Sequence, residues 1–600
     1  MIKKIYLSAL LLLGMTPGFT QVTKIRNLGR AAVFTRTISQ ATQVKNAAYV
    51  LPAPSGEDLN GIVNNHFTNN GRTEIVGEAG KKGTFTLSTD ASGMVTGTYH
   101  SILERRAFQY YTDGYGNLIA KEVAIESLIC MDYSRLEETS YGEAQHAAKP
   151  LRTTAIPRYS SKPGSKYVIY IDLDGETIAS SHWAGGKTIY AQPLANWTDS
   201  DVELIWEVAA QDYLIYDVNV TTDRAVFDAA DICQRKMCIV TSTLDAADGQ
   251  SIGGIAWIGS FDECTKDPCW VFNKGGKVTG ETVSHEVGHT VDLNHDGNSS
   301  SAYYTGHNNW APIMGAAYST GSIKLDNPNV MGQWSAGEYN GANNGEDDIV
   351  IIGTHNGFGF RPDEVGDTYT AAGKLTVESD GKVLGEKNQG IIGRRKDLDV
   401  YKFTCGSGDV TLTAAPYLKT PDLNKHPNLN IKLRLLNASG TELLVADPVP
   451  PSTANTFAAM AATITKTGLA AGTYYLEIDG VGNGSNASSG YTDYGSLGGY
   501  NISGTVPLAT GIDDEQIISQ FNIFPNPSNG TFNITFNTAI QTDYKMEVVN
   551  ALGQKVYGEI LTGFKGGFSG QLLLQQFGKG IYMVSIGNNN NQCSKRVVVY

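Results

Sequence analysis

The run HEVGHTVDLNHD, residues 285 to 296, limits what this chain can fold into more than any other part of its sequence. On an α-helix, residues four positions apart lie on the same face, so His285 and His289 can direct two imidazoles at one point. Glu286 points about 100° round the helix from His285, where its carboxylate can reach a metal-bound water without binding the metal. His295 lies six residues beyond His289, so the chain must turn back before it. The run therefore predicts a helix, a turn and one metal site.

Zinc is the metal that this ligand set favours, because catalytic zinc is held by three protein ligands and keeps a fourth position open for water. A chance HExxH match on an amphipathic helix is the alternative. Three neutral imidazoles buried together need partners for their ring nitrogens, and a metal ion accepts one nitrogen from each. The third histidine, His295, therefore favours a metal site over a histidine-rich core helix.

With these residues the sequence resembles the metzincin metallopeptidases, whose signature HExxHxxGxxH is followed by a methionine turn. Asp292 stands in place of the family glycine, and Asp is one of the residues that tolerate a left-handed backbone conformation. Asp296, after His295, is similar to the adamalysin (reprolysin-like) branch. Met314 in WAPIMGAAY resembles the methionine turn, and Met331 in NVMGQWS is a second candidate.

The resemblance implies a zinc endopeptidase in which His285, His289 and His295 hold the metal. Glu286 then acts as the general base: it takes a proton from the metal-bound water, which attacks a peptide carbonyl, and returns that proton to the leaving amine. The segment GGIAWIG, 253 to 259, is assigned by the same resemblance to the edge strand that pairs with an extended substrate, and an ordinary sheet strand is the alternative. A surface adhesin on a degenerate peptidase fold is the other function class, but the intact ligands and base argue for activity.

Around the zinc-site helix, the sequence predicts a mixed α+β domain. The apolar segment YVIYIDLDG predicts a strand, and TDSDVELIWEVAAQDY predicts a helix with Ser200 and Glu203 as its capping box. Asp347 and Asp348 are candidate ligands for a structural calcium ion, and a solvated helix start is the alternative.

Four cysteines fall within the same domain. Cys233 and Cys238 flank CQRKMC, and Cys264 and Cys269 flank CTKDPC. Because an exported protein can form disulfides, two short-range bridges are the first expectation, although four cysteines allow three pairings. A structural zinc site is disfavoured, since neither pair has CxxC spacing.

Cys130, in IESLICMDY, lies before the expected catalytic domain, where propeptides of the metallopeptidases that the chain resembles commonly supply a thiolate as a fourth zinc ligand. The hypothesis is a cysteine switch, in which the thiolate takes the place of the water and keeps the precursor latent. The flanking residues match no well-known switch motif. A plain buried cysteine is the alternative.

The N-terminus MIKKIYLSALLLLGMTPGFTQ has two lysines, an apolar run and then small or polar residues, which is typical of a signal peptide over residues 1–20. The apolar run is short for a membrane span, and a signal anchor is the alternative. Nothing later in the 600 residues offers 18 uninterrupted apolar residues, so no transmembrane segment is expected in the mature chain. The net charge of -14 argues against nucleic acid as a partner.

A chain of 600 residues is expected to be multidomain. Alternating strand patterns separated by Gly, Asn and Asp turns dominate it outside the catalytic region. We expect a β-rich propeptide and linker (21–160), an α+β zincin (metzincin) catalytic domain (161–360), a β-sandwich accessory domain (361–508) and a small β-sandwich sorting domain (515–600).

The last two domains resemble known modules. The strands of LDVYKFTCGSGDVTLTAA, NLNIKLRLLNASGTELL and AGTYYLEIDGVG resemble the pre-peptidase C-terminal β-sandwich of secreted bacterial peptidases, which implies an accessory role. FNIFPNPSNGTFNITF, YKMEVVNALGQKVY, KGIYMVSI and KRVVVY resemble the C-terminal sorting domain of the type IX secretion system. This implies passage through the periplasm, export by the type IX machinery, a secreted or cell-surface location, and removal of the tail at the surface.

Overall fold

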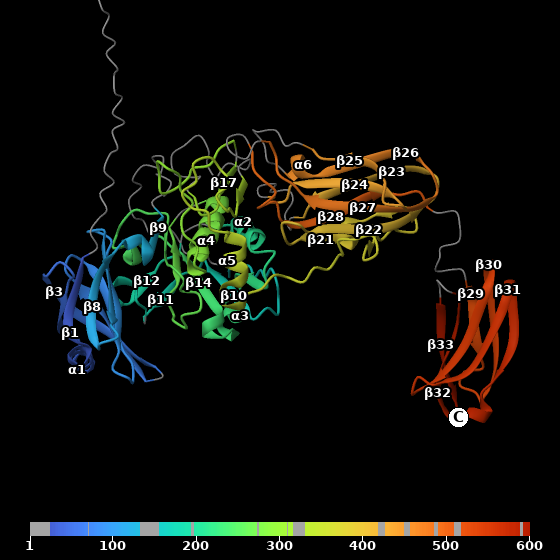
Figure 1. The fold of residues 1–600 in the computed structure, drawn as a ribbon, viewed down its shortest axis with the longest axis horizontal. Helices are drawn as coiled ribbons and strands as arrows, with labels where there is room; N and C mark the ends of the chain where they lie inside the picture. The colour runs from blue at the N-terminus through green and yellow to red at the C-terminus, as the bar shows by residue number, and fades with distance from the viewer. Residues whose placement is uncertain are drawn as a thin grey trace, which may run out of the picture.

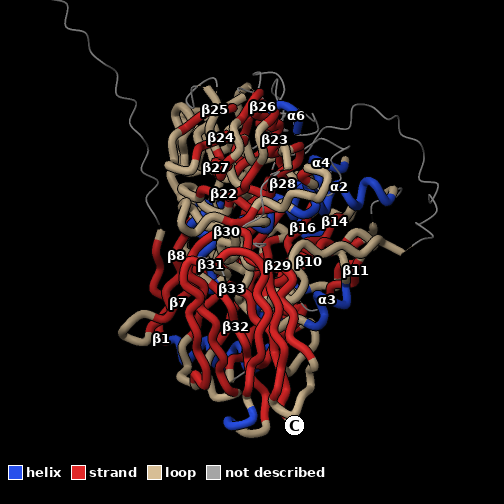
Figure 2. The backbone as a smooth tube through the Cα atoms, turned by 90° about the vertical axis from the view of Figure 1, so that its right-hand side faces the viewer, coloured by secondary structure: helices blue, strands red, loops and turns tan. Residues whose placement is uncertain are grey.

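The computed structural model describes thirteen segments of the chain, which are residues 24–69, 71–132, 155–179, 181–193, 197–272, 275–308, 310–315, 331–417, 427–448, 457–484, 490–508, 518–588 and 592–600. The predicted signal peptide, residues 1–20, and residues 133–154 of the predicted linker lie outside these segments. The chain is multidomain and rich in strands, with few helices, as the sequence predicts (Figures 1 and 2).

The first region is an eight-stranded antiparallel sheet, which we call the N-terminal sheet, in the order β1-β8-β7-β6-β5-β4-β3-β2. Apart from β1, strands that follow one another in the sequence are neighbours, so short turns suffice to connect them. α1 (Ala31–Ala41) packs its buried Ile38 into the same core as Phe85 and Tyr99. The strands are β1 (Ile25–Arg30), β2 (Ala47–Pro52), β3 (Asp58–Asn69), β4 (Arg72–Ala79), β5 (Gly83–Thr89), β6 (Val95–Ser101), β7 (Arg106–Thr112) and β8 (Asn117–Val123).

The central sheet has six strands in the order β13-β10-β14-β16-β15-β9. Its first four strands are parallel, whereas β15 is antiparallel to β16 and β9 is antiparallel to β15. The strands are β9 (Ile129–Asp132), β10 (Tyr167–Asp172), β13 (Val218–Thr221), β14 (Arg235–Val240), β15 (Gly254–Trp257) and β16 (Cys269–Val271). Thus β9 follows the N-terminal sheet in sequence but extends the central sheet.

Every residue of β10 is buried, because both faces of the central sheet are covered. Ile169 and Ile171 share a core with residues of α2 (Asp199–Asp212) and α4 (Gly276–Thr290). On the other face, Tyr170 shares a core with α3 (Arg224–Ala229) and the 3₁₀ turn η2 (Trp183–Gly186). The strand predicted from YVIYIDLDG is therefore the buried centre of the domain.

α2 begins two residues earlier than its predicted capping box. Thr198 is the N-cap: its hydroxyl accepts the Asp201 N–H at 3.1 Å, and the Asp201 carboxylate accepts the Thr198 N–H at 2.9 Å. The prediction of Ser200 and Glu203 as the capping box is wrong, because Ser200 already lies inside the first turn. The helix itself lies where the periodicity predicts it.

Shorter elements connect the central region. They are η1 (Ile125–Ser127), β11 (Glu176–Ile178), β12 (Ile189–Ala191), η3 (Ile232–Gln234), η4 (Asp245–Ala247), β17 (Trp310–Pro312), β18 (Met331–Gln333), α5 (Asp348–Thr354) and η5 (His355–Gly357). β11 pairs with β12, and β17 pairs in parallel with β18.

Residues 373 to 505 form two five-stranded sheets whose buried side chains belong to one hydrophobic cluster. One sheet has the order β19-β22-β27-β24-β25, and the other has the order β20-β28-β23-β26 with β21 also paired to β28. The elements are β19 (Gly373–Lys374), β20 (Lys382–Val383), η6 (Gly385–Lys387), β21 (Gln389–Ile392), β22 (Leu398–Cys405), β23 (Gly408–Pro416), β24 (Ile431–Asn437), β25 (Glu442–Ala446), α6 (Phe457–Met460), β26 (Ala462–Leu469), β27 (Gly472–Gly480) and β28 (Gly498–Thr505).

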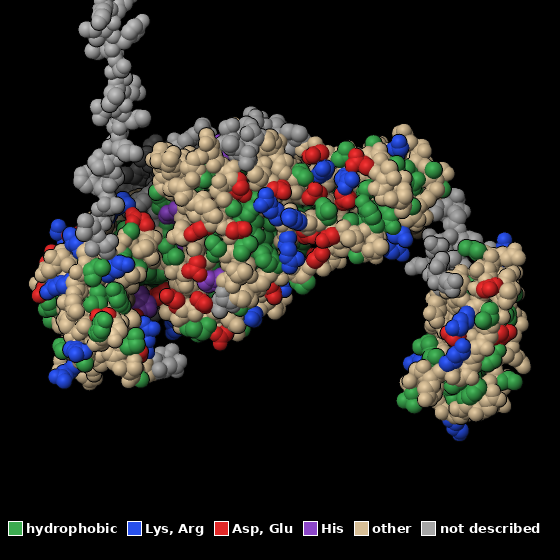
Figure 3. Space-filling model, in the orientation of Figure 1, with side chains coloured by type: hydrophobic (Ala, Val, Ile, Leu, Met, Phe, Trp, Pro, Cys, Tyr) green, Lys and Arg blue, Asp and Glu red, His purple; other side chains and the backbone are tan. Residues whose placement is uncertain are grey.

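The C-terminal region is a further five-stranded sheet with a core of its own, in the order β29-β30-β32-β33 with β31 paired to β30. Its elements are β29 (Ile518–Phe524), β30 (Thr531–Asn550), β31 (Lys555–Leu573), η9 (Gln575–Phe577), β32 (Gly580–Gly587) and β33 (Gln592–Val599). Acidic and basic side chains are interspersed over the face of the molecule drawn in Figure 3. Within the described segments, no helix is long and apolar enough to cross a membrane.

Candidate metal centre

Three imidazoles converge at the C-terminal end of α4. His285 and His289, one helical turn apart, place their Nε2 atoms 3.0 Å from each other, as the predicted helix requires. His295 comes in from beyond the helix and places its Nε2 atom 3.2 Å from that of His289. The structure therefore brings together the three histidines that the sequence singles out.

The turn between His289 and His295 depends on Asp292. α4 ends at Thr290, and the Leu293 N–H donates to the Gly288 carbonyl at 3.1 Å, which reverses the chain. Asp292 has a φ of 76°, a left-handed conformation that favours Gly and is tolerated by Asp. Asp at the family's glycine position thus keeps the turn that the resemblance requires.

Two backbone carbonyls orient the first two imidazoles. His285 Nδ1 lies 2.8 Å from the Ile313 carbonyl, and His289 Nδ1 lies 2.7 Å from the Leu293 carbonyl. A carbonyl only accepts a hydrogen bond, so each Nδ1 carries the proton and each Nε2 presents a lone pair. Burial lowers the pKa of His289 well below the usual histidine value, and the neighbouring His285 lowers it further, which keeps this ring neutral.

These contacts fit a zinc ion. At Zn–N distances of about 2.0–2.1 Å, two nitrogens of a tetrahedral site lie about 3.4 Å apart. The observed Nε2 separations of 3.0 and 3.2 Å are close to that value. Lone pairs that face one another in a buried site cannot form hydrogen bonds to each other, whereas a cation accepts all of them. The donor set therefore fits a zinc ion.

Cys130 supplies a fourth donor to the same cluster. The donor atoms of Cys130 and the three histidines all lie within 4.8 Å of one another, and the Cys130 Sγ is 2.5 Å from His295 Nε2. Cys130 is buried on β9, where it pairs with Ala256 of β15. The strand predicted to receive substrate, within residues 253 to 259, is thus already paired with the segment that carries Cys130.

Met314 lies directly beneath α4. It is fully buried, and a Cβ built on Gly288 would lie 2.8 Å from its Sδ atom. The preceding residue, Ile313, provides the carbonyl that orients His285. Met331, the second candidate, lies in a different cluster with Trp310 and Tyr339, among others. The geometry is that expected of a methionine turn at Met314.

Glu286 is fully buried beside the histidine cluster. It lies close to Gly254, which the sequence analysis does not single out. A Cβ built on Gly254 of β15 would lie 2.2 Å from Glu286 Oε1 and 2.6 Å from its Cδ. A glycine within a strand often marks a place where another group approaches the backbone closely, and this is the only signal in the sequence that points to Gly254. The carboxylate occupies the space that a larger residue at position 254 would fill.

The prediction of two short-range disulfide bridges is wrong. Cys233 is bonded to Cys264, whereas Cys238 and Cys269 are buried thiols that face each other on neighbouring strands. β14 and β16 are parallel, so the segments that precede them lie at the same edge and bring Cys233 to Cys264. A bridge from Cys233 to Cys238 would have to span extended chain, which is too long for a disulfide. Burial raises the pKa of the Cys238 thiol.

Asp347 and Asp348 have internal hydrogen-bond partners. Asp347 caps α5, with its carboxylate accepting the Val350 N–H at 3.1 Å and the Tyr494 hydroxyl at 2.7 Å. Asp348 accepts the Ser335 N–H at 3.0 Å. Asp347 is exposed and fits the solvated helix start that is the alternative to a calcium site, whereas Asp348 is buried in the first turn of α5.

Comparison with known proteins identifies two parts of the chain. Residues 205–296, which include α4 and all three histidines, match the family model for Metallo-peptidase family M12B Reprolysin-like. The chain carries a reprolysin-like metallopeptidase domain. Residues 522–600 match the Secretion system C-terminal sorting domain, which marks a protein sent to the cell surface or beyond by secretion machinery. The resemblances to reprolysin-like metallopeptidases and to the sorting domain are confirmed, whereas the resemblance of residues 361–508 to the pre-peptidase C-terminal β-sandwich stays a prediction.

Comparisons with curated proteins and with solved structures do not bear on the metallopeptidase assignment. No curated protein matches the sequence. A β-glucuronidase of Faecalibacterium prausnitzii is 12% identical with a TM-score of 0.12, over 33% of this chain and 36% of that chain. A two-domain fibronectin type-III segment of chicken tenascin is 14% identical with a TM-score of 0.14, over 33% and 97%. The chain spans about a third of the glucuronidase's length, and TM-scores this low carry no argument.

Proposed function

We propose that the chain is the precursor of a secreted zinc endopeptidase, made as a zymogen. The observation that carries the proposal is the convergence of three imidazole Nε2 atoms beside the buried Glu286, within a domain that matches reprolysin-like metallopeptidases. Each of these residues is needed for hydrolysis, whereas an adhesin on the same fold would not need them.

His285, His289 and His295 would hold the ion. When bound there, zinc supplies a Lewis acid and lowers the pKa of a bound water to about 7. The Ile313 and Leu293 carbonyls keep two of the rings in the required tautomer. Glu286 takes the proton of the attacking water and delivers it to the leaving amine, and the Gly254 backbone beside it leaves room for that carboxylate.

Latency follows from the position of β9. β15 would pair with an extended substrate, but β9 already runs antiparallel to it, from Trp257 opposite Ile129 to Gly254 opposite Asp132. The Cys130 thiolate, placed among the three imidazoles, would take the coordination position that water needs. Residues 24–132 then act as a propeptide that blocks both the metal and the substrate strand.

The remaining steps concern export. A signal peptide over residues 1–20 takes the chain to the periplasm, and the tail from 515 to 600 directs it to the type IX machinery, which removes it at the surface. The two-sheet region between 361 and 508 acts as an accessory module. The substrates are proteins or peptides.

Glu286→Gln tests the proposed chemistry. Because Glu286 is a base rather than a ligand, the variant should bind zinc in the same ratio as the parent while peptide hydrolysis falls by at least about a hundredfold. Zinc analysis and a peptide-library cleavage assay, with and without a chelator, measure both quantities on the precursor and the trimmed form. Glu203→Gln, on α2, is the matched control and should leave both unchanged. Comparable hydrolysis by Glu286→Gln, or by the metal-free protein, would overturn the proposal.

A further inference from the structure

The N-terminal sheet contacts the metallopeptidase domain through η2. Ala184, Gly185 and Gly186 have φ values of 50°, 64° and 81°, which form a left-handed turn. The Gly185 N–H donates to the Thr84 hydroxyl at 2.9 Å, and the Asn64 amide donates to the Gly185 carbonyl at 2.9 Å. The turn is therefore hydrogen-bonded to the N-terminal sheet from both sides.

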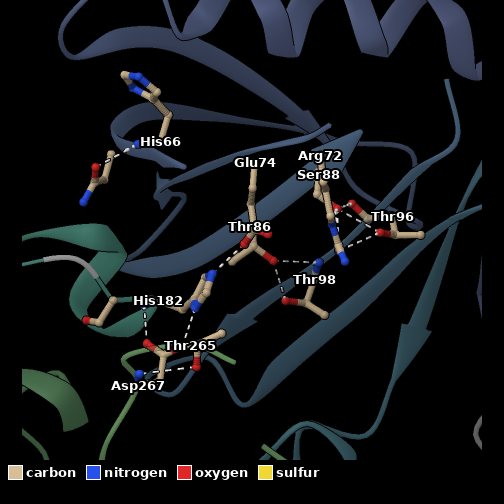
Figure 4. A network of polar contacts seen from close by, with 12 residues as sticks. His66, Arg72, Glu74, Thr86, Ser88, Thr96, Thr98, His182, Thr265 and Asp267 are labelled. Atoms are coloured by element: carbon tan, nitrogen blue, oxygen red, sulfur yellow. Dashed lines mark hydrogen bonds and ion pairs between the residues drawn. The ribbon is translucent and has the colours of Figure 1, made fainter. Parts of the chain in front are cut away.

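His182, just before this turn, joins the two parts of the chain (Figure 4). Its Nε2 lies 2.5 Å from Oε1 of Glu74 on β4, and its Nδ1 lies 2.5 Å from Oδ2 of Asp267 in the metallopeptidase domain. The other oxygen of Asp267 accepts the backbone N–H of His182 at 2.7 Å. Ionised carboxylates only accept hydrogen bonds, so both ring nitrogens must donate, which requires the imidazolium form.

The charges around His182 favour this form. Burial alone lowers the pKa of His182, but Asp267 and Glu74 outweigh burial and hold it well above the usual value. Glu263 also acts on this group as a negative charge. Lys236 opposes them, and its amino group donates to the Ser260 and Asp267 carbonyls at 2.6 and 3.2 Å. On the N-terminal side the Phe67 ring, 5.5 Å away, adds no charge.

We propose that His182 is a proton-dependent latch: docking of the N-terminal sheet takes up a proton at His182, so the propeptide holds tightly at acidic and neutral pH and loosens as the pH rises. The regulatory meaning of this latch rests on the proposed function, since it assumes that residues 24–132 are a propeptide. The docking geometry does not depend on catalysis.

The direction follows from the carboxylate that docking adds. Undocked, His182 keeps Asp267 but loses Glu74, so its pKa is lower than in the docked state. A group whose pKa is raised on docking stabilises the docked state fully below its undocked pKa, and this stabilisation is lost as the pH rises through its docked pKa. Between these two values the opening constant should rise by up to about tenfold per pH unit, because one proton is released.

Hydrogen exchange of the full chain tests the latch without any hydrolysis. In a Glu286→Gln background, the peptide covering residues 181–187 reports on the Gly185 amide, whose partner is Thr84. After correction for the intrinsic exchange rate, its protection should fall as the pH rises from 6 to 9.5, by up to about tenfold per pH unit, while β10 stays protected. In His182→Gln the protection should be lower and independent of pH.

Two further variants complete the test, and each removes one ion pair between the N-terminal sheet and the metallopeptidase domain. Glu74→Gln keeps the histidine but removes the added carboxylate, so the slope should disappear. Glu78→Gln removes the ion pair to Lys187, 2.6 Å apart, which involves no histidine, so protection should fall at every pH while the slope remains. A parent without pH dependence, or the parent's slope retained in either His182→Gln or Glu74→Gln, overturns the proposal. Loss of peptidase activity alone would contradict the proposed function and leave this result unchanged.

Discussion

The proposed site needs a residue without a side chain, Gly254, as much as it needs the side chains that carry its chemistry. Gly254 belongs to a strand and Glu286 to a helix, yet a Cβ on the first would overlap the carboxylate of the second. Because Glu286 is fully buried, it has little space in which to move aside. Gly254 is therefore a positioning residue for the proposed base.

Gly254→Ala should reduce kcat by at least about tenfold while changing KM little and leaving the zinc content intact, because a base displaced by about 1 Å loses most of its effect. Steady-state kinetics and metal analysis of the trimmed enzyme measure the three quantities. Gly345→Ala is the control, since a Cβ there meets nothing within 4 Å. An unchanged kcat in Gly254→Ala would show that the carboxylate has room to spare.

The metal ligands could be predicted because they lie within eleven residues: His285 and His289 follow helical periodicity, and His295 stands where the motif places the third ligand after a turn. The role of Gly254 could not be predicted, because its contact with Glu286 depends on how β15 packs against α4. The pairing of Cys233 with Cys264 escaped prediction for a similar reason: it depends on the order of strands in the central sheet, which local spacing does not encode.

At the scale of elements, the contact between β9 and β15 combines two kinds of inhibition. Backbone pairing covers the strand, and the same short segment carries Cys130 into the metal cluster. Without the Cys130 thiol, β9 would pair with β15 as an extended substrate does and leave the metal position free. Without the strand pairing, nothing would hold the thiol beside the three histidines. The proposed latency thus requires both.

Cys130→Ser should allow the uncleaved precursor to hydrolyse peptides at least about tenfold faster than the parent precursor, since a hydroxyl is a far weaker zinc ligand than a thiolate. A fluorogenic peptide assay on intact precursor, checked by mass for the absence of cleavage, measures this. Cys593→Ser, in the C-terminal sheet, should remain latent. A Cys130→Ser precursor as silent as the parent would support the plain buried cysteine instead.

Element positions were predicted better than element boundaries. TDSDVE contains two overlapping frames, Thr198 with Asp201 and Ser200 with Glu203, and both suit a capping box. The structure uses the earlier frame, and the local sequence alone does not distinguish the two. The pairing of Cys130 with Ala256 joins residues 126 positions apart, a distance at which periodicity carries no information.

At the scale of the whole molecule, separate cores allow separate functions. The C-terminal sheet has a hydrophobic cluster of its own, and the N-terminal sheet has another, although Ala107 of β7 packs into a cluster shared with Trp183 and Trp270 of the metallopeptidase domain. The separate core of the C-terminal sheet fits its proposed removal after export, whereas the proposed release of the N-terminal sheet would also expose the shared cluster. The modules could be recognised from sequence because their motifs are local, whereas the bridge from His182 to Glu74 could not.

Deleting residues 515–600 should leave the peptidase trapped in the periplasm, because the matching sorting domain lies within the deleted tail. Cell fractionation followed by immunoblotting measures the distribution, and full-length Cys593→Ser should be exported like the parent. Unimpaired export of the truncated chain would contradict the proposed route.

The antiparallel partner on β15 has a consequence for the life of the activated enzyme. If β9 is released as proposed, the backbone donors and acceptors of Gly254 to Trp257 would face solvent, and such an uncovered strand edge can pair with any extended polypeptide, including another copy of the enzyme. The proposed mature enzyme should therefore self-associate more readily than its precursor. Dilution after secretion would limit this self-association.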